Sequence, residues 1–293
     1  MTDTSASTAP AIVATILPDP PALFDARARR LAALAPGSAI EPYLALLARV
    51  ARGQARAVRE VAIPAPPARG GAVPLWPSLA LVGPAWRRML ATVVAAARGP
   101  DLPGEADAAL RRLEAAAPAA LDRMAEAILA GGLAPAVRAE SLADAPFVGA
   151  ALQAGFAVLA AGLHAAALAP ADCGCPACGS PPVAGVIRGV DRLRYLACAL
   201  CGTSWYLPRV HCGACGGNAG IVHLALPGED GLKAEACGAC GAYVKLVDEE
   251  RRPGAEPLAD DAATLTLDLL VAQEGYGRAG PNLLLRAAPM EAA

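Results

Sequence analysis

Apolar side chains recur at helical spacing through the first 171 of the 293 residues. Between residues 41 and 61, for example, Tyr43, Leu47 and Val50 fall near one stripe. Pro118 interrupts a longer run and predicts either a kink or two helices there. The helical runs cover residues 22–35, 41–61, 85–98, 105–130 and 135–168. We predict that residues 1–171 form an α-helical domain.

One run in this half is long enough to cross a bilayer, because residues 147–171 contain no charged side chain. Its composition argues against that placement. The run is mainly alanine and glycine, and it contains Gln153 and His164. It is flanked by Asp144 and Asp172 rather than by lysine or arginine. We predict a buried helix and no membrane span.

The pattern changes after residue 171, where glycine and proline become frequent and short β-prone runs replace the helical stripes. These runs lie at 186–187, 205–207, 221–224 and 243–244. We predict two small β modules, at 172–207 and 208–252, followed by a C-terminal helix and tail at 253–293. One side of that helix is expected to carry Leu258, Leu265, Leu269 and Ala272. The predicted fold class is α+β.

Nine cysteines are confined to the two predicted β modules, between Cys173 and Cys240. A CxxC turn directs two thiolates at one point, and two such turns complete a tetrahedral four-sulfur site for Zn²⁺ or a rubredoxin-type iron. The sequence therefore predicts two ions, iron or zinc, each in a four-cysteine site. The CxxC pairs are Cys175/Cys178, Cys198/Cys201, Cys212/Cys215 and Cys237/Cys240.

The spacing favours sequential pairing of these turns, because 19 residues separate Cys178 from Cys198 and 21 separate Cys215 from Cys237. A crossed pairing stays open, as does the choice between a structural and a redox role. Cys173 lies outside the four pairs and is left unassigned. Glycine follows each pair and is expected to adopt the positive φ that directs backbone amides at sulfur, at Gly179, Gly202, Gly216 and Gly241.

The charge of the chain argues against nucleic acid as its partner. The chain has a formal net charge of −2, and between residues 173 and 250 it carries six basic and seven acidic side chains. Proteins that bind phosphate backbones need clustered positive charge, so a zinc-ribbon nucleic-acid-binding protein is the less favoured alternative. Aromatic residues make up only 4% of the chain, which also argues against base stacking.

The sequence offers no recognisable catalytic motif, neither a phosphate-binding loop, HExxH, nor a dinucleotide fingerprint. Asp260 and Asp261 could pass for a catalytic carboxylate pair, but they fit the helix macrodipole equally well. We therefore predict no enzyme and no catalytic residue. The N-terminus lacks the basic and apolar regions of a secretory signal, so we expect a cytoplasmic protein with reduced cysteines.

The chain resembles FdhE, the formate dehydrogenase accessory protein family of bacteria, continuously from about Ala145 to Leu285. Over the N-terminal helices only the general layout agrees. The segments that carry the resemblance are APFVGAALQAGF, CPACGSPPVAGVI, LRYLACALCGTSWYLPRVHCGACG, KAEACGACGAYVKLV and ADDAATLTLDLLVAQEGYGRAGPNLLL.

The resemblance implies an accessory protein that is required for formate dehydrogenase activity. It would bind the catalytic subunit in the cytoplasm before export. It also implies a helical N-terminal part and two rubredoxin-like metal modules, with iron as the metal. The alternative function is a rubredoxin-like electron-transfer protein. The resemblance carries the metal-ligand role onto Cys175, Cys178, Cys198, Cys201, Cys212, Cys215, Cys237 and Cys240.

Overall fold

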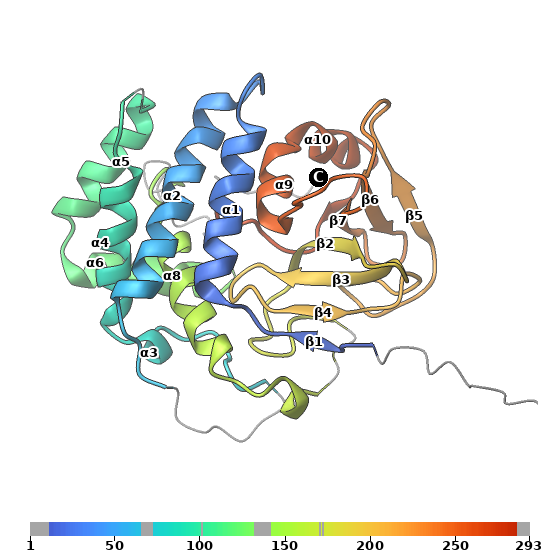
Figure 1. The fold of residues 1–293 in the computed structure, drawn as a ribbon, viewed down its shortest axis with the longest axis horizontal. Helices are drawn as coiled ribbons and strands as arrows, with labels where there is room; N and C mark the ends of the chain where they lie inside the picture. The colour runs from blue at the N-terminus through green and yellow to red at the C-terminus, as the bar shows by residue number, and fades with distance from the viewer. Residues whose placement is uncertain are drawn as a thin grey trace, which may run out of the picture.

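The computed structural model describes residues 12–65, 73–100, 102–131, 142–169, 171 and 173–285. Helices occupy the first half of the chain and a sheet occupies most of the second (Figure 1). Figure 1 shows α1, α2 and α8 between the strands and the outer helices α4, α5 and α6. The helices of this half are α1 (Pro20–Leu34), α2 (Glu41–Glu60), α3 (Leu79–Val82), α4 (Ala85–Ala97), α5 (Gly104–Ala115), α6 (Pro118–Leu129), α8 (Ala145–Ala161) and the 3-10 helix η1 (Ala165–Ala167).

Local signals set several of these boundaries. The Asp19 carboxylate accepts a hydrogen bond from the Ala22 amide at 3.1 Å, and Pro20 opens α1 at the first helical position. The run from 105 to 130 contains two helices, and α6 begins at Pro118, as one of the two sequence-based alternatives predicts. The run from 135 to 168 contributes α8 and η1, while residues 132–141 lie outside the described residues.

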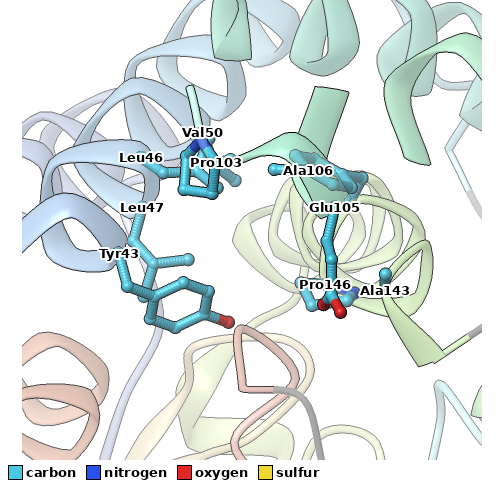
Figure 2. A pocket seen from close by; sticks show the side chains of 10 residues that line it. Tyr43, Leu46, Leu47, Val50, Pro103, Glu105, Ala106, Ala143 and Pro146 are labelled. Atoms are coloured by element: carbon cyan, nitrogen blue, oxygen red, sulfur yellow. The ribbon is translucent and has the colours of Figure 1, made fainter. Parts of the chain in front are cut away.

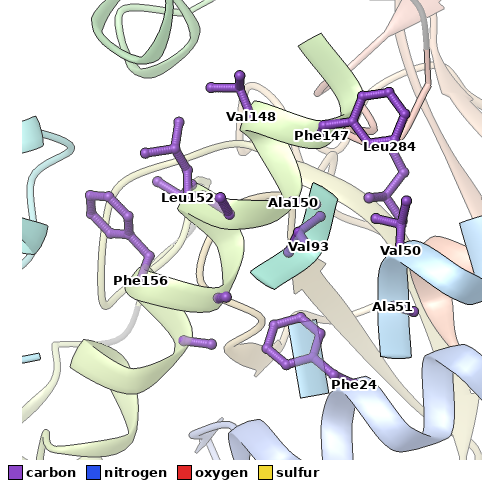
Figure 3. Close-up of a cluster of buried hydrophobic side chains, with 14 of the residues drawn as sticks. Phe24, Val50, Ala51, Val93, Phe147, Val148, Ala150, Leu152, Phe156 and Leu284 are labelled. Carbon is purple, nitrogen blue, oxygen red and sulfur yellow. The ribbon is translucent and has the colours of Figure 1, made fainter. Parts of the chain in front are cut away.

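Helix α8 is the centre of the main core, as predicted for a buried helix, but it ends at Ala161, and residues 161–169 are exposed or half-buried. Figure 3 shows its side chains leaving in several directions, with Phe24 of α1, Val50 of α2 and Val93 of α4 around them. Gly149 lies so close to the returning C-terminal segment that a Cβ there would be 2.8 Å from the Leu283 carbonyl oxygen. Among the described helices, none is both long and apolar enough to cross a membrane.

The eight strands among the described residues form one sheet in the order β1-β4-β3-β2-β7-β6-β5, with β8 paired to β7. The first module supplies β4-β3-β2 and the second supplies β7-β6-β5, so the same antiparallel arrangement occurs twice. Parallel pairing of β2 with β7 joins the two repeats. The strands are β1 (Thr15–Ile16), β2 (Pro182–Arg188), β3 (Leu193–Cys198), β4 (Ser204–Tyr206), β5 (Ile221–Leu224), β6 (Leu232–Cys237), β7 (Ala242–Asp248) and β8 (Gly277–Arg278).

The predicted C-terminal helix is wrong in its continuity, and so is the single side that was expected to carry both Leu258 and Leu269. It consists of α9 (Pro257–Ala263) and α10 (Leu265–Gln273), with Thr264 at the break. The cause is Lys245, whose Nζ donates to the carbonyl oxygens of Asp261 at 2.7 Å and of Thr264 at 3.3 Å. The change of direction buries Val271 and leaves Leu269 66% exposed.

Candidate metal centre

The first two CxxC pairs meet beside the helical half of the chain. Cys175 and Cys178 lie in the loop before β2, and Cys198 and Cys201 lie at the turn between β3 and β4. The Sγ atoms are 3.6 Å apart for Cys175 and Cys201, and 3.4 Å apart for Cys178 and Cys198. The structure thus brings the first pair to the second, in the sequential arrangement that the spacing favours.

The third and fourth pairs meet in the same way in the second repeat. Cys212 and Cys215 lie before β5, and Cys237 and Cys240 lie at the turn between β6 and β7. The Sγ atoms of Cys212 and Cys240 are 3.7 Å apart, and those of Cys215 and Cys237 are 3.9 Å apart. In each of the two groups all four sulfurs lie within 4.8 Å of one another.

These separations fit a shared metal ion. A tetrahedron with metal–sulfur bonds of about 2.3 Å has sulfur–sulfur edges of about 3.8 Å. The four separations above span 3.4 to 3.9 Å, which is far longer than the roughly 2.0 Å of a disulfide. Each group could therefore hold one tetrahedral ion with little movement of its sulfurs.

The turns also direct backbone amides at the sulfurs. The amides of Leu200 and Cys201 donate to Cys198 Sγ at 3.3 Å, and the Ala214 amide donates to Cys212 Sγ at the same distance. The glycine after each pair has the predicted positive φ, at 75° for Gly179, 74° for Gly202, 72° for Gly216 and 72° for Gly241. Such amides stabilise negative charge on sulfur, which is the protonation state that binds metal.

Within each group the surroundings raise the pKa of some thiols and lower the pKa of another. Burial raises the pKa of the Cys198 and Cys201 thiols, whereas hydrogen bonds from neighbouring thiols lower the pKa of Cys178. Burial raises the pKa of Cys212 to about 12. Burial also opposes ionisation of Cys237, but amide hydrogen bonds bring its pKa down to about 7. A metal ion would therefore have to displace protons from the remaining thiols, because four adjacent thiolates require a cation.

A buried polar chain connects the first cysteine group to three helices. Gln153 on α8 donates through Nε2 to the carbonyl oxygen of Ala199, which lies between Cys198 and Cys201, at 2.8 Å. Its Oε1 accepts from Gln54 of α2 at 3.1 Å and from Arg27 of α1 at 3.4 Å. The sequence analysis missed this structural role. Gln153 is a lone amide side chain in the long uncharged run, and there it served only as an argument against a membrane span.

A second buried contact joins the two repeats. Arg194 on β3 is 1% exposed and forms an ion pair with Glu235 on β6. Its guanidinium also donates to the carbonyl oxygen of His211, the residue before Cys212, at 2.6 Å. Burial lowers the pKa of Arg194, while Glu235 opposes that shift. His223 lies 3.4 Å from the same carboxylate and belongs to neither four-cysteine group.

Asp260 and Asp261 are fully buried ion-pair partners, and Asp260 also lies in the first turn of α9, where a carboxylate suits the helix dipole. The Arg30 guanidinium is 2.5 Å from Asp260, while Lys245 and Arg278 each lie 2.9 Å from Asp261. Burial would raise the pKa of Asp261, but these two basic partners outweigh it and hold the pKa below its usual value. The carboxylates therefore attach α9 to α1 and to β7.

A cavity of about 230 Å³ lies between α2, α5 and α8 (Figure 2). Its lining is apolar apart from the Tyr43 hydroxyl and the Glu105 carboxylate. The Tyr43 hydroxyl donates to the Leu284 carbonyl oxygen at 2.6 Å. The cavity offers apolar contact rather than acid–base chemistry. Cys173, the ninth cysteine, is exposed and belongs to neither four-cysteine group.

Comparison with known proteins covers nearly the whole described chain. Family models match at residues 12–172 (FdhE, N-terminal), 174–209 (FdhE, central domain) and 210–285 (FdhE, C-terminal domain). A "Protein FdhE homolog" of Rhizobium meliloti is 37% identical over 273 residues, which is 88% of each chain. The homolog of Pseudomonas putida is 38% identical over 286 residues, covering 90% of this chain and 87% of its own.

A solved structure agrees with the sequence matches. The crystal structure of the FdhE protein from Pseudomonas aeruginosa superposes with a TM-score of 0.76 at 32% identity, covering 94% of this chain and 99% of that one. The resemblance stated from the cysteine region thus extends over the N-terminal helices as well. The chain belongs to the FdhE family.

Proposed function

We propose that this chain is an accessory protein required for formate dehydrogenase activity, which binds the enzyme's catalytic subunit in the cytoplasm before export. Membership of the FdhE family, matched from residue 12 to residue 285, carries this proposal. The resemblance described above identifies that family with formate dehydrogenase accessory proteins. Both four-cysteine groups are present with tetrahedral spacing, so the metal chemistry implied by the family is available to the chain. The role is one of assembly or maturation rather than catalysis.

The same proposal gives each group one iron or zinc ion, with the eight cysteines as ligands. Soft thiolates select these metals, and the sulfur separations fit their bond lengths. Bound iron would supply one-electron chemistry, whereas bound zinc would supply structure alone. The chain's own contribution is to present four sulfurs in a fixed geometry, with the amides of residues such as Leu200 and Ala214 directed at them.

The test is anaerobic affinity purification of the tagged full-length chain from cells that make formate dehydrogenase. We expect the catalytic subunit to co-elute and metal analysis to give two ions per chain. In a strain that lacks the native gene, the Cys198→Ser/Cys201→Ser variant should fail to restore formate dehydrogenase activity, although the enzyme's subunits are still expressed. Normal activity with that variant, or no co-elution of the subunit, would contradict the proposal.

The second candidate function is a rubredoxin-like electron carrier. The observation that favours it is the exposure of Cys215 and Cys240, which places one four-sulfur group at the surface. A reversible visible absorbance change during reduction and reoxidation, with turnover on an electron donor and no bound subunit, would support the carrier. A colourless zinc protein that still binds the subunit would support docking alone.

A further inference from the structure

The two four-cysteine groups differ in how far solvent reaches their sulfurs. In the first group Cys175 is 2% exposed, Cys198 is 1% exposed, and Cys178 and Cys201 are fully buried. In the second group Cys212 and Cys237 are buried, but Cys215 and Cys240 are exposed. Two ligand sets with the same spacing therefore stand in different environments.

The first group is enclosed because the helical half packs over both of its turns. Its four cysteines belong to the same buried cluster as Phe24 and Phe156. The amide of Leu75 donates to the Ala177 carbonyl oxygen, between Cys175 and Cys178, at 2.9 Å. On the other turn, a Cβ at Gly202 would be 2.6 Å from the Leu23 side chain on α1. Reaching these sulfurs requires a local opening of this packing.

The second group has no such cover from the described residues. At Gly241, the counterpart of Gly202, an added Cβ would meet no atom within 4 Å. Residues 218–220 and 238–240, on either side of the sulfurs, are exposed. The Gly238 amide donates to the Gly220 carbonyl oxygen at 2.8 Å, and Cys237 Sγ lies 3.9 Å from the Ala219 carbonyl oxygen. A reagent can therefore approach Cys215 and Cys240 without any unfolding of the core.

We propose that the Cys212/Cys215/Cys237/Cys240 group is an exchange site, from which an external donor can take the metal ion, and that the Cys175/Cys178/Cys198/Cys201 group is a structural site. The inference rests on the metal binding in the proposed function. In the exchange step an external nitrogen, oxygen or sulfur donor forms a bond to the ion as the Cys215 or Cys240 thiolate leaves. The leaving thiolate takes a proton from water, and no electron is transferred.

The experiment uses the full-length chain with Cys173→Ser, which removes the exposed ninth thiol, loaded anaerobically with two Zn²⁺ ions. The chelator 4-(2-pyridylazo)resorcinol reports zinc release by its colour. We expect one ion per chain to leave at least about tenfold faster than the other, because access to the first group needs a local opening that costs free energy. Iodoacetamide labelling with peptide mass spectrometry should modify Cys215 and Cys240 first.

A matched pair of variants identifies the fast ion. The exposed-group variant, Cys215→Ser/Cys240→Ser, should lose the fast phase and keep one slowly released ion. The buried-group variant, Cys178→Ser/Cys201→Ser, should keep the fast phase if it folds. If it does not fold, the release kinetics and the labelling order of the parent Cys173→Ser chain decide between the two groups. Release of both ions at one rate, or first labelling of the buried cysteines, would overturn this inference alone. A chain that binds no zinc would overturn the metal assignment as well.

Discussion

The buried ion pair between Arg27 on α1 and Glu256 at the start of α9 attaches the helical half to the C-terminal helices. The guanidinium donates to Glu256 Oε1 at 3.1 Å through Nε and at 2.9 Å through Nη2. The two side chains are 1% and 5% exposed. Glu256 Oε2 also accepts the Ala259 amide at 2.8 Å and so caps α9. The Arg27→Met substitution keeps the apolar stem but leaves this carboxylate buried without its cation.

The burial of both partners sets the expected magnitude. Removing one member of a buried, hydrogen-bonded pair costs about 3–5 kcal/mol, because the remaining charge is left uncompensated. The double variant Arg27→Met/Glu256→Gln removes both charges and keeps an oxygen that can cap α9, so it should lose less stability than Arg27→Met alone. Arg56→Met serves as the control, since its pair with Glu60 is exposed and spans one helical turn.

The assay is urea unfolding of the metal-loaded chain, followed by far-UV circular dichroism. We expect the largest shift of the midpoint for Arg27→Met, a smaller one for the double variant, and none beyond error for Arg56→Met. A cost below about 1 kcal/mol for Arg27→Met would refute the reasoning, because it would mean that water or another cation compensates Glu256. A double variant as unstable as the sum of Arg27→Met and Glu256→Gln, each measured alone, would show that the two charges are not coupled.

Three further predictions concern the turns, acid stability and metal removal. Gly202→Ala should lower the melting temperature more than Gly241→Ala, because both residues have positive φ but only Gly202 faces Leu23. The folded-state pKa of Asp261 is depressed, so its contribution to stability is present above about pH 4 and is lost as the pH falls through the lower folded value. Urea midpoints measured between pH 6 and pH 3 should therefore fall, and less steeply for Asp261→Asn. Stripping both ions with a chelator should lower the melting temperature in calorimetry, and the buried-group variant should melt below the exposed-group variant.

The sequence predicts the four CxxC turns because the geometry of each turn is local. A CxxC turn with a following glycine specifies two sulfurs and a positive φ within five residues, and the structure has that φ at Gly179, Gly202, Gly216 and Gly241. Helix periodicity likewise locates α1 and α2 to within two residues at each end. Short-range signals of this kind do not depend on what packs against them.

The parts that sequence reasoning missed depend on contacts between distant residues. The break at Thr264 follows from Lys245, which lies 19 residues earlier in the chain. Its Nζ donates to the carbonyl oxygens of Asp261 and Thr264, next to the break. Gln153 contacts Ala199 across 46 residues, and Arg27 contacts Glu256 across 229. Nothing in the local pattern around either end of such a contact identifies the other end. A polar or charged residue inside an apolar run is the signal that could mark such positions.

Parallel pairing of β2 with β7 explains why two similar repeats differ in exposure. A closed dyad of modules would give both groups equivalent surroundings, but here the repeats stand head to tail in one sheet. The helical half therefore packs against the turns of the first repeat, where Leu23 and Trp76 lie against Gly202 and Gly179. The corresponding surface of the second repeat is left open at Gly241. Duplication of the module can thus supply two identical sets of cysteine ligands. The helices pack over only one of these sets, so solvent reaches the sulfurs of the other.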